Sequence, residues 1–246
     1  MKISIITAVY NRADFIEEAI LSLRNQSWKN VEHVIIDGAS TDGTLDILLR
    51  LRQKNDLLIS EPDIGLYYAL NKGLKLTTGD IIGVLHSDDF YADNKALELV
   101  AKAFSDPNVD MVYGDLNYVS RYNSKKIIRR WRSEKFTPIK LRYGWMPPHP
   151  TLFIRRSLYE KKGGFNCDFK ISADYELILR YFSNFDRGFV YLPHTIMNMR
   201  LGGESNKSLS KICQKTKEDY LALKQNRAGG IVAIIYKNIV KLPQFL

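Results

Sequence analysis

The sequence predicts an α/β protein in which a Rossmann-like, mostly parallel sheet is flanked by helices. Short runs of branched apolar residues alternate with amphipathic segments over roughly the first 90 residues, in units of about 20 to 30 residues. This β-α-β-α-β-α-β alternation is typical of parallel strands joined by crossover helices. Polar residues follow each apolar run, and ligands bind at the carboxyl ends of the strands in such sheets.

The N-terminal elements follow directly from this periodicity. Asp14 can cap the first helix, whose apolar residues recur at the spacing of one helical face. Thr41 or Asp42 can start the second helix. The run at 81–85 is short and mostly branched, which indicates a strand buried on both faces. The predicted strands are 2–9, 31–36, 57–60 and 81–85, and the predicted helices are 15–23, 45–52 and 67–76.

The alternation weakens after Asp93, and the second half is assigned piece by piece. Three prolines at 145–150 predict a rigid loop without regular structure. Predicted helices are 96–104, 173–182, 208–226 and an amphipathic piece at 231–240; predicted strands are 109–114 with 116–119 as its partner, 126–131, 151–154, 189–192 and 196–200. We expect a domain at 1–205, divided into halves at 1–115 and 116–205, and a C-terminal helical extension at 206–246.

Composition narrows the class of protein. The chain has 246 residues, 45% of them hydrophobic, which is enough for one large domain. Cys167 and Cys213 match no metal-ligand spacing and suggest a reducing compartment. No apolar run approaches the ~18 residues that span a bilayer, and the first residues lack a secretory signal pattern. We therefore expect a cytoplasmic protein.

The formal net charge of +9 is concentrated at 121–142 and after residue 206. Such clusters suggest an anionic partner, or else a solvated basic face. The last segment has apolar residues spaced for one helical face, and it suits a membrane interface unless it packs back on the sheet. The residues concerned are Ile231, Val232, Ile234, Ile235, Ile239 and Leu242, with Lys207, Lys211, Lys215, Lys217, Lys237 and Lys241 nearby.

Adjacent carboxylates follow the central strand, at Asp88 and Asp89. Two neighbouring charges repel each other unless a cation compensates, and Mg²⁺ or Mn²⁺ is the natural partner. The alternative is an acidic loop that caps the next helix. The parallel sheet places further polar residues along the same rim: Thr7, Tyr10, Asn11, Asp37 and Asp63.

Five motifs in order make the chain resemble a family 2 glycosyltransferase with the GT-A fold. They are Thr7-Ala8-Val9-Tyr10-Asn11, the run 37–44 (DGASTDGT), the runs 60–65 (SEPDIG) and 69–73 (ALNKG), Ser87-Asp88-Asp89, and the later runs 149–153 (HPTLF) and 173–177 (ADYEL). The resemblance covers 3–205 and is strongest to the bacterial branch that builds O-antigen and exopolysaccharide. Ser87 stands where the family's Asp-x-Asp metal motif has its first Asp, a variant common in this family.

The resemblance implies a UDP-sugar donor and a role for most of these residues. Tyr10 can lie against the nucleobase, while the Thr7 hydroxyl and the backbone at Ala8 bind its edge. The resemblance assigns Asp37 to the uracil N–H, Asp88 to the ribose and Asp89 to the metal on the diphosphate. Further candidates for nucleotide-sugar binding are Asn11, Asp63, Asn71 and Lys72, of which Lys72 could instead be solvated.

Asp174 is the candidate general base for inverting transfer, because the acceptor hydroxyl must lose its proton as it attacks. The alternative is a helix-capping role. Where the family often has Glu before this Asp, the chain has Ala173. His149 is expected in the acceptor wall, or as a structural hydrogen-bonding group. Arg200, followed by two glycines, resembles a mobile loop that closes over the diphosphate.

Two other functions fit parts of the pattern. A sugar nucleotidyltransferase would need a Gly-rich loop after the first strand, but 10–14 contains no glycine. A non-catalytic basic module explains the charge but not the acidic rim, which would repel phosphate without a metal. We therefore expect no nucleic-acid partner. The expected partners are a UDP-sugar, a glycan acceptor on a lipid diphosphate, and the anionic inner face of the cell membrane, where the protein would be peripheral.

Overall fold

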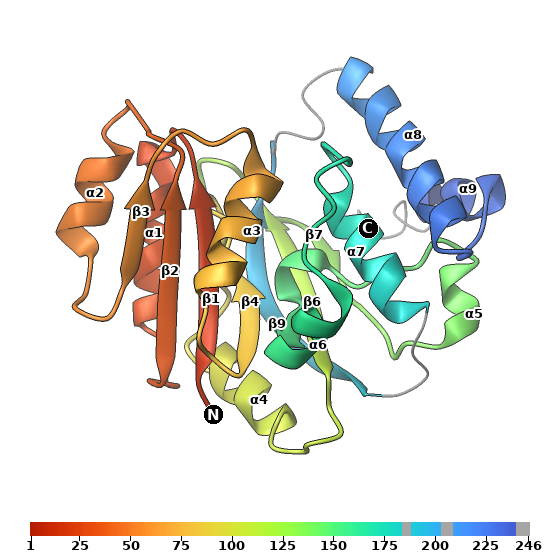
Figure 1. Ribbon diagram of the computed structural model, residues 1–246, viewed down its shortest axis with the longest axis horizontal. Helices are drawn as coiled ribbons and strands as arrows, with labels where there is room; N and C mark the ends of the chain where they lie inside the picture. Colours follow the sequence, from red (N-terminus) through yellow and green to blue (C-terminus); the bar gives the residue numbers. More distant parts are fainter. Residues whose placement is uncertain (184–187, 203–208, 240–246) are drawn as a thin grey trace.

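The computed structural model describes residues 1–183, 188–202 and 209–239, and in them one sheet carries helices on both faces (Figure 1). The strands are β1 (Ile3–Val9), β2 (Val31–Asp37), β3 (Leu57–Ser60), β4 (Ile81–Val84), β5 (Phe90–Tyr91), β6 (Met111–Val119), β7 (Ile127–Trp131), β8 (Phe153–Arg155) and β9 (Phe189–Arg200). The helices are α1 (Ala13–Arg24), α2 (Thr44–Leu51), α3 (Leu66–Leu76), α4 (Ala96–Ala103), α5 (Pro138–Leu141), α6 (Arg156–Lys162), α7 (Ala173–Phe182), α8 (Leu209–Gln225) and α9 (Ile231–Ile239).

Within these residues the sheet runs in the order β3-β2-β1-β4-β8-β6-β9-β5, with β7 paired to β6. The pairs β2–β3, β1–β2 and β1–β4 are parallel, as the sequence predicts. Beyond β4 the sheet is mixed, because β8 is antiparallel to both β4 and β6 while β9 is parallel to β6. The parallel part brings the ends of β1, β2 and β4 to one rim.

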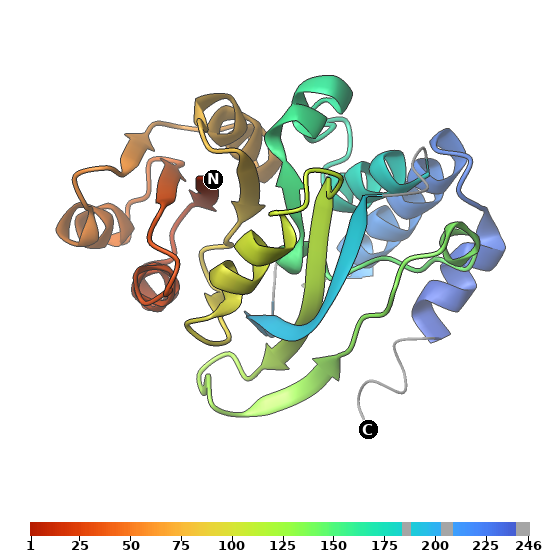
Figure 2. The same ribbon diagram turned by 90° about the horizontal axis from the view of Figure 1, so that it is seen from below.

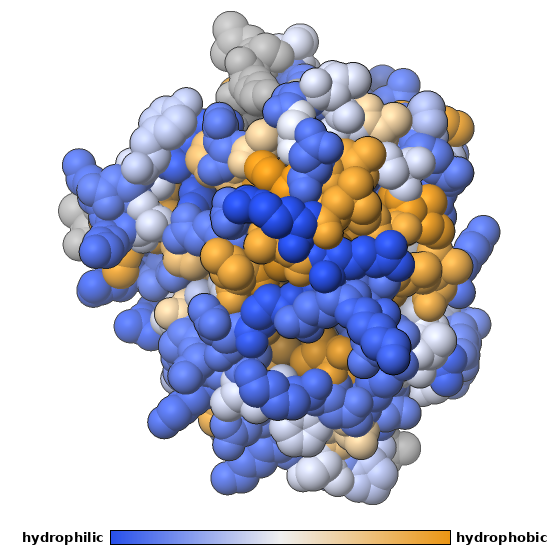
Figure 3. Space-filling model, turned by 90° about the vertical axis from the view of Figure 1, so that its left-hand side faces the viewer, coloured by the Kyte–Doolittle hydropathy of each residue, from blue (hydrophilic) through white to orange (hydrophobic). Residues whose placement is uncertain are grey.

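Two apolar layers cover the two faces of the sheet. Successive side chains of β1 point to opposite faces. Ile6 belongs to the layer that contains apolar residues of α3, α6 and α7, and Ile5 belongs to the layer with those of α1 and α4. Figure 2 shows this arrangement end-on, with α1 and α4 on one side of the sheet and α3, α6 and α7 on the other. Viewed from the α2 side, the surface is mainly hydrophilic, with apolar side chains gathered in its middle (Figure 3).

The starts of the first two helices differ from the prediction. Asp14 does not cap α1; it lies in the first turn, after Arg12 at the N-cap. The free N–H of Ala13 is bonded instead by Asp42 Oδ2 at 3.1 Å. The second helix begins at Thr44 with Gly43 at the N-cap, so neither Thr41 nor Asp42 caps it as predicted. Asp42 does accept from the backbone N–H of Thr44. One carboxylate therefore ties the two helix starts together.

Strands β6 and β9 are each continuous where the sequence predicts two pieces. The segment 116–119 continues its own strand instead of pairing with 109–114. The sequence predicts two strands, 189–192 and 196–200, but β9 runs through Pro193. The register with β6 shifts there, between the pairs Tyr113–Tyr191 and Asp115–Thr195. Proline lacks a backbone donor and is tolerated at such irregularities.

Three short elements were not predicted: β5, α5 and α6. The loop predicted at 145–150 also ends in a single 3₁₀ turn, His149–Thr151. These elements are two to seven residues long, too short for a hydrophobic period to be recognised.

The C-terminal helices pack on the domain. Ala222 and Leu223 of α8 and Ala233 of α9 belong to the same apolar layer as α7. Gly144 lets α9 approach: it has φ +70°, and a Cβ there would lie 2.2 Å from the carbonyl oxygen of Ala233. Lys237, predicted beside a membrane-facing surface, is buried against Asp219 at 2.8 Å. Lys207, Lys241 and Leu242 lie outside the described residues.

Candidate active site

A cavity of about 780 Å³ opens at the carboxyl ends of β1 and β4. Both predicted halves of the domain line it, since β1, α3 and the segment after β4 meet there with α7 and the end of β9. The structure brings most of the predicted residues to this cavity: Ala8, Tyr10, Asn11, Asp63, Asp88, Asp89, His149, Asp174 and Arg200.

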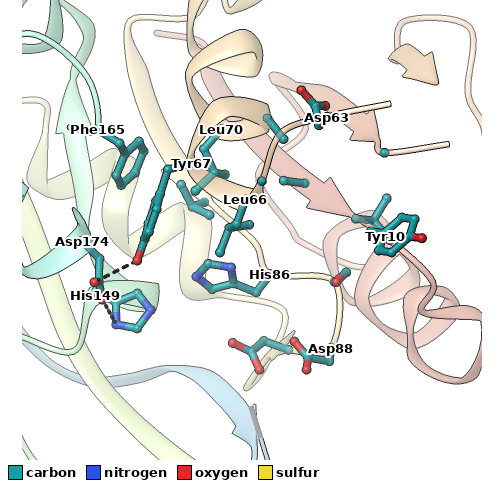
Figure 4. Close-up of a pocket in the computed structure, with 18 of the residues that line it drawn as sticks. Tyr10, Asp63, Leu66, Tyr67, Leu70, His86, Asp88, His149, Phe165 and Asp174 are labelled. Atoms are coloured by element: carbon teal, nitrogen blue, oxygen red, sulfur yellow. Dashed lines mark hydrogen bonds and ion pairs between the residues drawn. The ribbon is translucent and has the colours of Figure 1, made fainter. Parts of the chain in front are cut away.

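Tyr10 lies at one end of the cavity, with Asp63 on the same side (Figure 4). Its ring is 59% exposed, so one aromatic face is free for a planar partner. The next residue, Asn11, has a φ of 50° and accepts a hydrogen bond from the N–H of Thr41 at 2.9 Å. Its own N–H donates to Ser40 Oγ. The turn after β1 is thereby fixed to the turn after β2, and both border the space around Tyr10.

Asp88 and Asp89 lie in the middle of the cavity wall. Asp89 is buried, and its Oδ1 accepts from the backbone N–H of Arg200 at 3.2 Å. Its Oδ2 is buried with no hydrogen-bond partner among the described residues. Burial, with the neighbouring Asp88 charge, raises the pKa of the Asp89 carboxyl well above its usual range.

Asp174 lies at the end of the cavity away from Tyr10, in the first turn of α7 (Figure 4). The Tyr67 hydroxyl lies 3.2 Å from its Oδ1, and His149 Nδ1 lies 3.2 Å from its Oδ2. Burial alone would raise the pKa of Asp174, but the charges of His149 and Lys237 and the N–H of Tyr175 lower it. Burial also lowers the pKa of His149 to about 4. At neutral pH the site therefore holds an ionised carboxylate beside a neutral imidazole.

Sequence reasoning missed three residues of the site. The His86 ring lies 5.4 Å from that of His149, between Asp88 and Asp174 in the cavity (Figure 4). Tyr67 and Phe165 are stacked, with ring centroids 5.6 Å apart. His86 directly precedes the carboxylate motif, which was the available signal; an isolated Tyr or Phe in an apolar segment gives none.

Four predicted nucleotide ligands do not line the cavity. Thr7 is fully buried, with its hydroxyl 2.9 Å from His33 Nε2. The predicted contact of this hydroxyl with a base edge stays a prediction. Asp37 is also buried and accepts from Ser40 and from Ser60 Oγ at 2.6 Å. Its assignment to uracil stays a prediction.

The other two are Asn71 and Lys72. Asn71 is bonded in both directions to the backbone of Phe165, at 2.8 and 2.9 Å, and so holds the loop that carries this ring. Lys72 is paired with Glu61 at 2.6 Å and Asp63 at 2.9 Å, and these carboxylates raise its pKa. Its charge is thus already balanced.

Arg200 was predicted in a mobile loop, and this is also corrected. It ends β9 and is buried. Its guanidinium donates to the carbonyl of Asp88 at 2.5 Å and pairs with Glu18. Arg200 thus holds the Asp88 backbone and one carboxylate oxygen of Asp89. Gly203 lies outside the described residues.

Residues 4–171 match the family described as Glycosyl transferase family 2. The chain belongs to this family. Its relatives include an uncharacterized glycosyltransferase of Mycobacterium tuberculosis, 30% identical over 72% of this chain and 68% of the relative. A PGL/p-HBAD biosynthesis glycosyltransferase of Mycobacterium bovis is 31% identical over 74% and 70%. A hyaluronan synthase of Pasteurella multocida is 29% identical over 92% of this chain but 23% of its own length.

Solved structures share the fold of this glycosyltransferase. Staphylococcus aureus TarS superposes with a TM-score of 0.70 at 19% identity, over 98% of this chain and 42% of the TarS chain. A mannosyltransferase of Pyrobaculum calidifontis gives 0.70 at 20% identity, over 99% and 72%. The predicted GT-A architecture is confirmed, and membership of a transferase family sets aside the nucleotidyltransferase and the non-catalytic module. The matched residues end before Asp174.

The acidic wall of this glycosyltransferase fits a divalent cation. A buried oxygen without a donor, on Asp89 beside the second carboxylate Asp88, is a hard ligand of the kind that Mg²⁺ and Mn²⁺ prefer. No cluster of three or more His, Cys, Asp or Glu side chains suited to a metal occurs in the described residues. The chain would thus supply one or two carboxylates and leave the other positions to substrate oxygens and water.

Proposed function

We propose that this glycosyltransferase moves a sugar, with inversion, from a UDP-sugar to a hydroxyl of a lipid-linked bacterial surface glycan such as O-antigen or exopolysaccharide. The observation that carries the proposal is that Asp174 and the Asp88–Asp89 pair face one cavity from different sides. TarS has been solved with UDP and with UDP-GlcNAc, and the Pyrobaculum mannosyltransferase with GDP-Man and Mn²⁺. These neighbours support a nucleotide-sugar donor and a metal here.

The donor would lie with its base on Tyr10 and its diphosphate toward Asp88 and Asp89. Asp89 would hold Mn²⁺ or Mg²⁺, which when bound offsets the charge that develops on the departing diphosphate. The anomeric carbon then lies between the carboxylate pair and Asp174. An acceptor hydroxyl that enters from the Asp174 side attacks opposite the leaving group, and this geometry inverts the anomeric centre.

Asp174 would take the acceptor proton. A bond forms between the acceptor oxygen and the anomeric carbon, the bond to the diphosphate breaks, UDP leaves, and the proton goes to the Asp174 carboxylate. The lowered pKa keeps this carboxylate ionised at neutral pH, and Tyr67 and His149 hold its two oxygens in place. Such a positioned base contributes about 10²–10⁴-fold.

The test compares two carboxamide variants by UDP-sugar binding and turnover. Asp174→Asn should keep UDP-sugar affinity and lose about 10²–10⁴-fold in turnover. Asp89→Asn should lose transfer together with metal-dependent UDP binding. Asp46→Asn, an exposed residue of α2, is the matched control. Full activity of Asp89→Asn would exclude the metal role, and parallel loss of donor binding and turnover in Asp174→Asn would exclude the base role.

The acceptor's lipid would hold the enzyme at the inner face of the membrane. The described residues include no helix that is long and apolar enough to span a bilayer. Helix α9 exposes an apolar face at Ile231, Val232 and Ile235. On the same helix the Tyr236 ring packs against the Tyr143 ring, which follows α5, with centroids 5.3 Å apart. An exposed apolar helix face next to basic residues suits the headgroup region of an anionic leaflet.

A further inference from the structure

A second cavity, of about 300 Å³, lies against the first on the side of Asp174. Both cavities are lined by His149, Asp174 and Arg200. The second is bordered by β7, by the 140–146 segment and by the C-terminal helices α8 and α9, which pack beside α7 (Figure 1). A molecule in this cavity therefore lies next to the proposed base but away from Tyr10.

Aromatic rings form one wall of the second cavity. Tyr118 and Trp131 lie parallel, with ring centroids 6.4 Å apart and planes at 4°. The Arg129 guanidinium lies over both rings, at 4.6 and 5.6 Å from their centroids, and keeps them in place. Tyr143 and Trp145 also line it. Broad ring faces of this kind suit the apolar C–H face of a sugar ring.

Among the described cations that line this cavity, one has no ion-pair partner. Lys140 pairs with Glu134 at 2.8 Å, Lys237 pairs with Asp219 at 2.8 Å, and Arg200 pairs with Glu18. Lys215, half-buried on α8, has no carboxylate within ion-pair distance in the described part of the chain. It lies close enough for its charge to act on Asp174, His149 and Lys237. An ammonium in a cavity that is not held in an ion pair can still donate a charge-assisted hydrogen bond to an anion.

We infer that the second cavity takes the acceptor as a sugar ring bearing an anionic group, phosphate or carboxylate, and that Lys215 recognises this group. The inference rests on the proposed role of Asp174, because the acceptor hydroxyl must reach this carboxylate. It makes α8 a determinant of acceptor choice, outside the matched family residues.

Tryptophan fluorescence measures binding in this cavity directly. The chain has three tryptophans, and Trp131 and Trp145 line the second cavity, so a Trp28→Phe background leaves only the cavity reporters. The full chain is held with saturating Mn²⁺ and UDP to occupy the donor cavity. It is then titrated with the 1-phosphates of glucose, galactose and N-acetylglucosamine, with the matching methyl glycosides, and with methyl glucuronide as the carboxylate arm.

At least one anionic probe should bind about tenfold or more tightly than the neutral glycosides. Lys215→Ala should remove this preference, Lys215→Arg should keep it, and Lys217→Ala, an exposed neighbour on α8, should leave it unchanged. The relative affinity of the phosphates and the glucuronide identifies the anion. Equal binding of anionic and neutral probes, no binding of any, or the same loss in Lys217→Ala would overturn the inference. No transfer occurs in this assay, so its failure is distinct from failure of the turnover test.

Discussion

Asp89 and Asp174 both face the main cavity, but their neighbours give them opposite properties. Asp89 lies beside a second carboxylate, with one buried oxygen that nothing in the described chain satisfies. Asp174 accepts from the Tyr67 hydroxyl, lies 3.2 Å from His149 Nδ1, and has cations nearby. The surroundings of Asp89 suit a bound cation, whereas those of Asp174 keep its carboxylate ionised without one. Two carboxylates with different surroundings can thus perform different tasks in one site.

His149 should make the protein less stable in acid. Its pKa of about 4 lies below the usual 6.5, so the unfolded chain binds this proton first and stability falls as pH decreases from about 6.5 to about 4. Asp174 titrates below this window, since its pKa is lowered. The free energy of unfolding, measured by urea denaturation at pH 7 and at pH 4.5, should fall less between these two pH values for His149→Gln than for the wild type. His33, with a pKa of about 3, is unchanged in both proteins. An equal loss in both would mean that His149 is charged in the fold.

Thr7 should contribute to the stability of the fold and not to the affinity for UDP. Thr7→Val keeps the shape but leaves His33 Nε2 without its partner in a buried site. Such a group costs about 1–3 kcal/mol, so the melting temperature should drop while the Kd for UDP stays the same. Ser105→Ala, which removes an exposed hydroxyl that donates to the Lys102 carbonyl after α4, serves as a comparison. Weaker UDP binding in Thr7→Val would instead support the predicted contact with the base edge.

Some site residues could be placed from the sequence because their position at the end of a strand or the start of a helix is enough to bring them to the cavity. Asp88 and Asp89 follow a buried strand and Asp174 begins a helix, so the rim and α7 bring them to the cavity. Thr7, Asn71 and Lys72 depend on partners outside their own strand or helix, namely His33, Phe165 and Glu61. Periodicity carries no information about such partners.

At the scale of elements, α3 and the loop before α7 act together on the base. Asn71 of α3 holds the Phe165 backbone, Phe165 stacks on Tyr67, and Tyr67 contacts Asp174. Asn71 and Tyr67 both belong to α3. This helix therefore positions the Asp174 oxygen Oδ1, while His149 lies next to the other oxygen, Oδ2. The strands and helices of the first half were predictable from period alone, whereas the continuity of β9 depends on its pairing with β6.

Asn71→Ala should therefore lower turnover more than donor binding. The variant frees two backbone groups of Phe165 and loosens the ring that supports Tyr67. We expect kcat to fall about tenfold, with the Kd for UDP changed less than twofold. Lys75→Ala, on the last turn of α3, is the control. Unchanged kcat in Asn71→Ala, or an equal loss in the control, would contradict this coupling.

At the scale of the whole molecule, the C-terminal helices complete the domain. They contribute to the apolar layer of α7, and Gly144 accommodates the backbone of α9. The boundary expected at 205 and 206 stays a prediction, but the two parts share a core. Removing the residues after Gly230 would expose this core, so point substitutions on the outer face of α9 are the better probe of membrane binding.

Val232 and Ile235 are 58% and 52% exposed on that outer face. Arg142, which lies against Gly229, and Arg227 are exposed nearby. Burying two such apolar side chains in a bilayer contributes about 1 kcal/mol or more for each, so Val232→Ser with Ile235→Ser should weaken co-sedimentation with anionic vesicles about tenfold or more. Leu49→Ser alters an equally exposed apolar residue on α2, at the far end of the molecule (Figure 1). It should bind vesicles like the wild type, and binding by both should fall at high salt. If the control loses binding equally, or if the wild type does not sediment with the vesicles, α9 does not dock on a membrane.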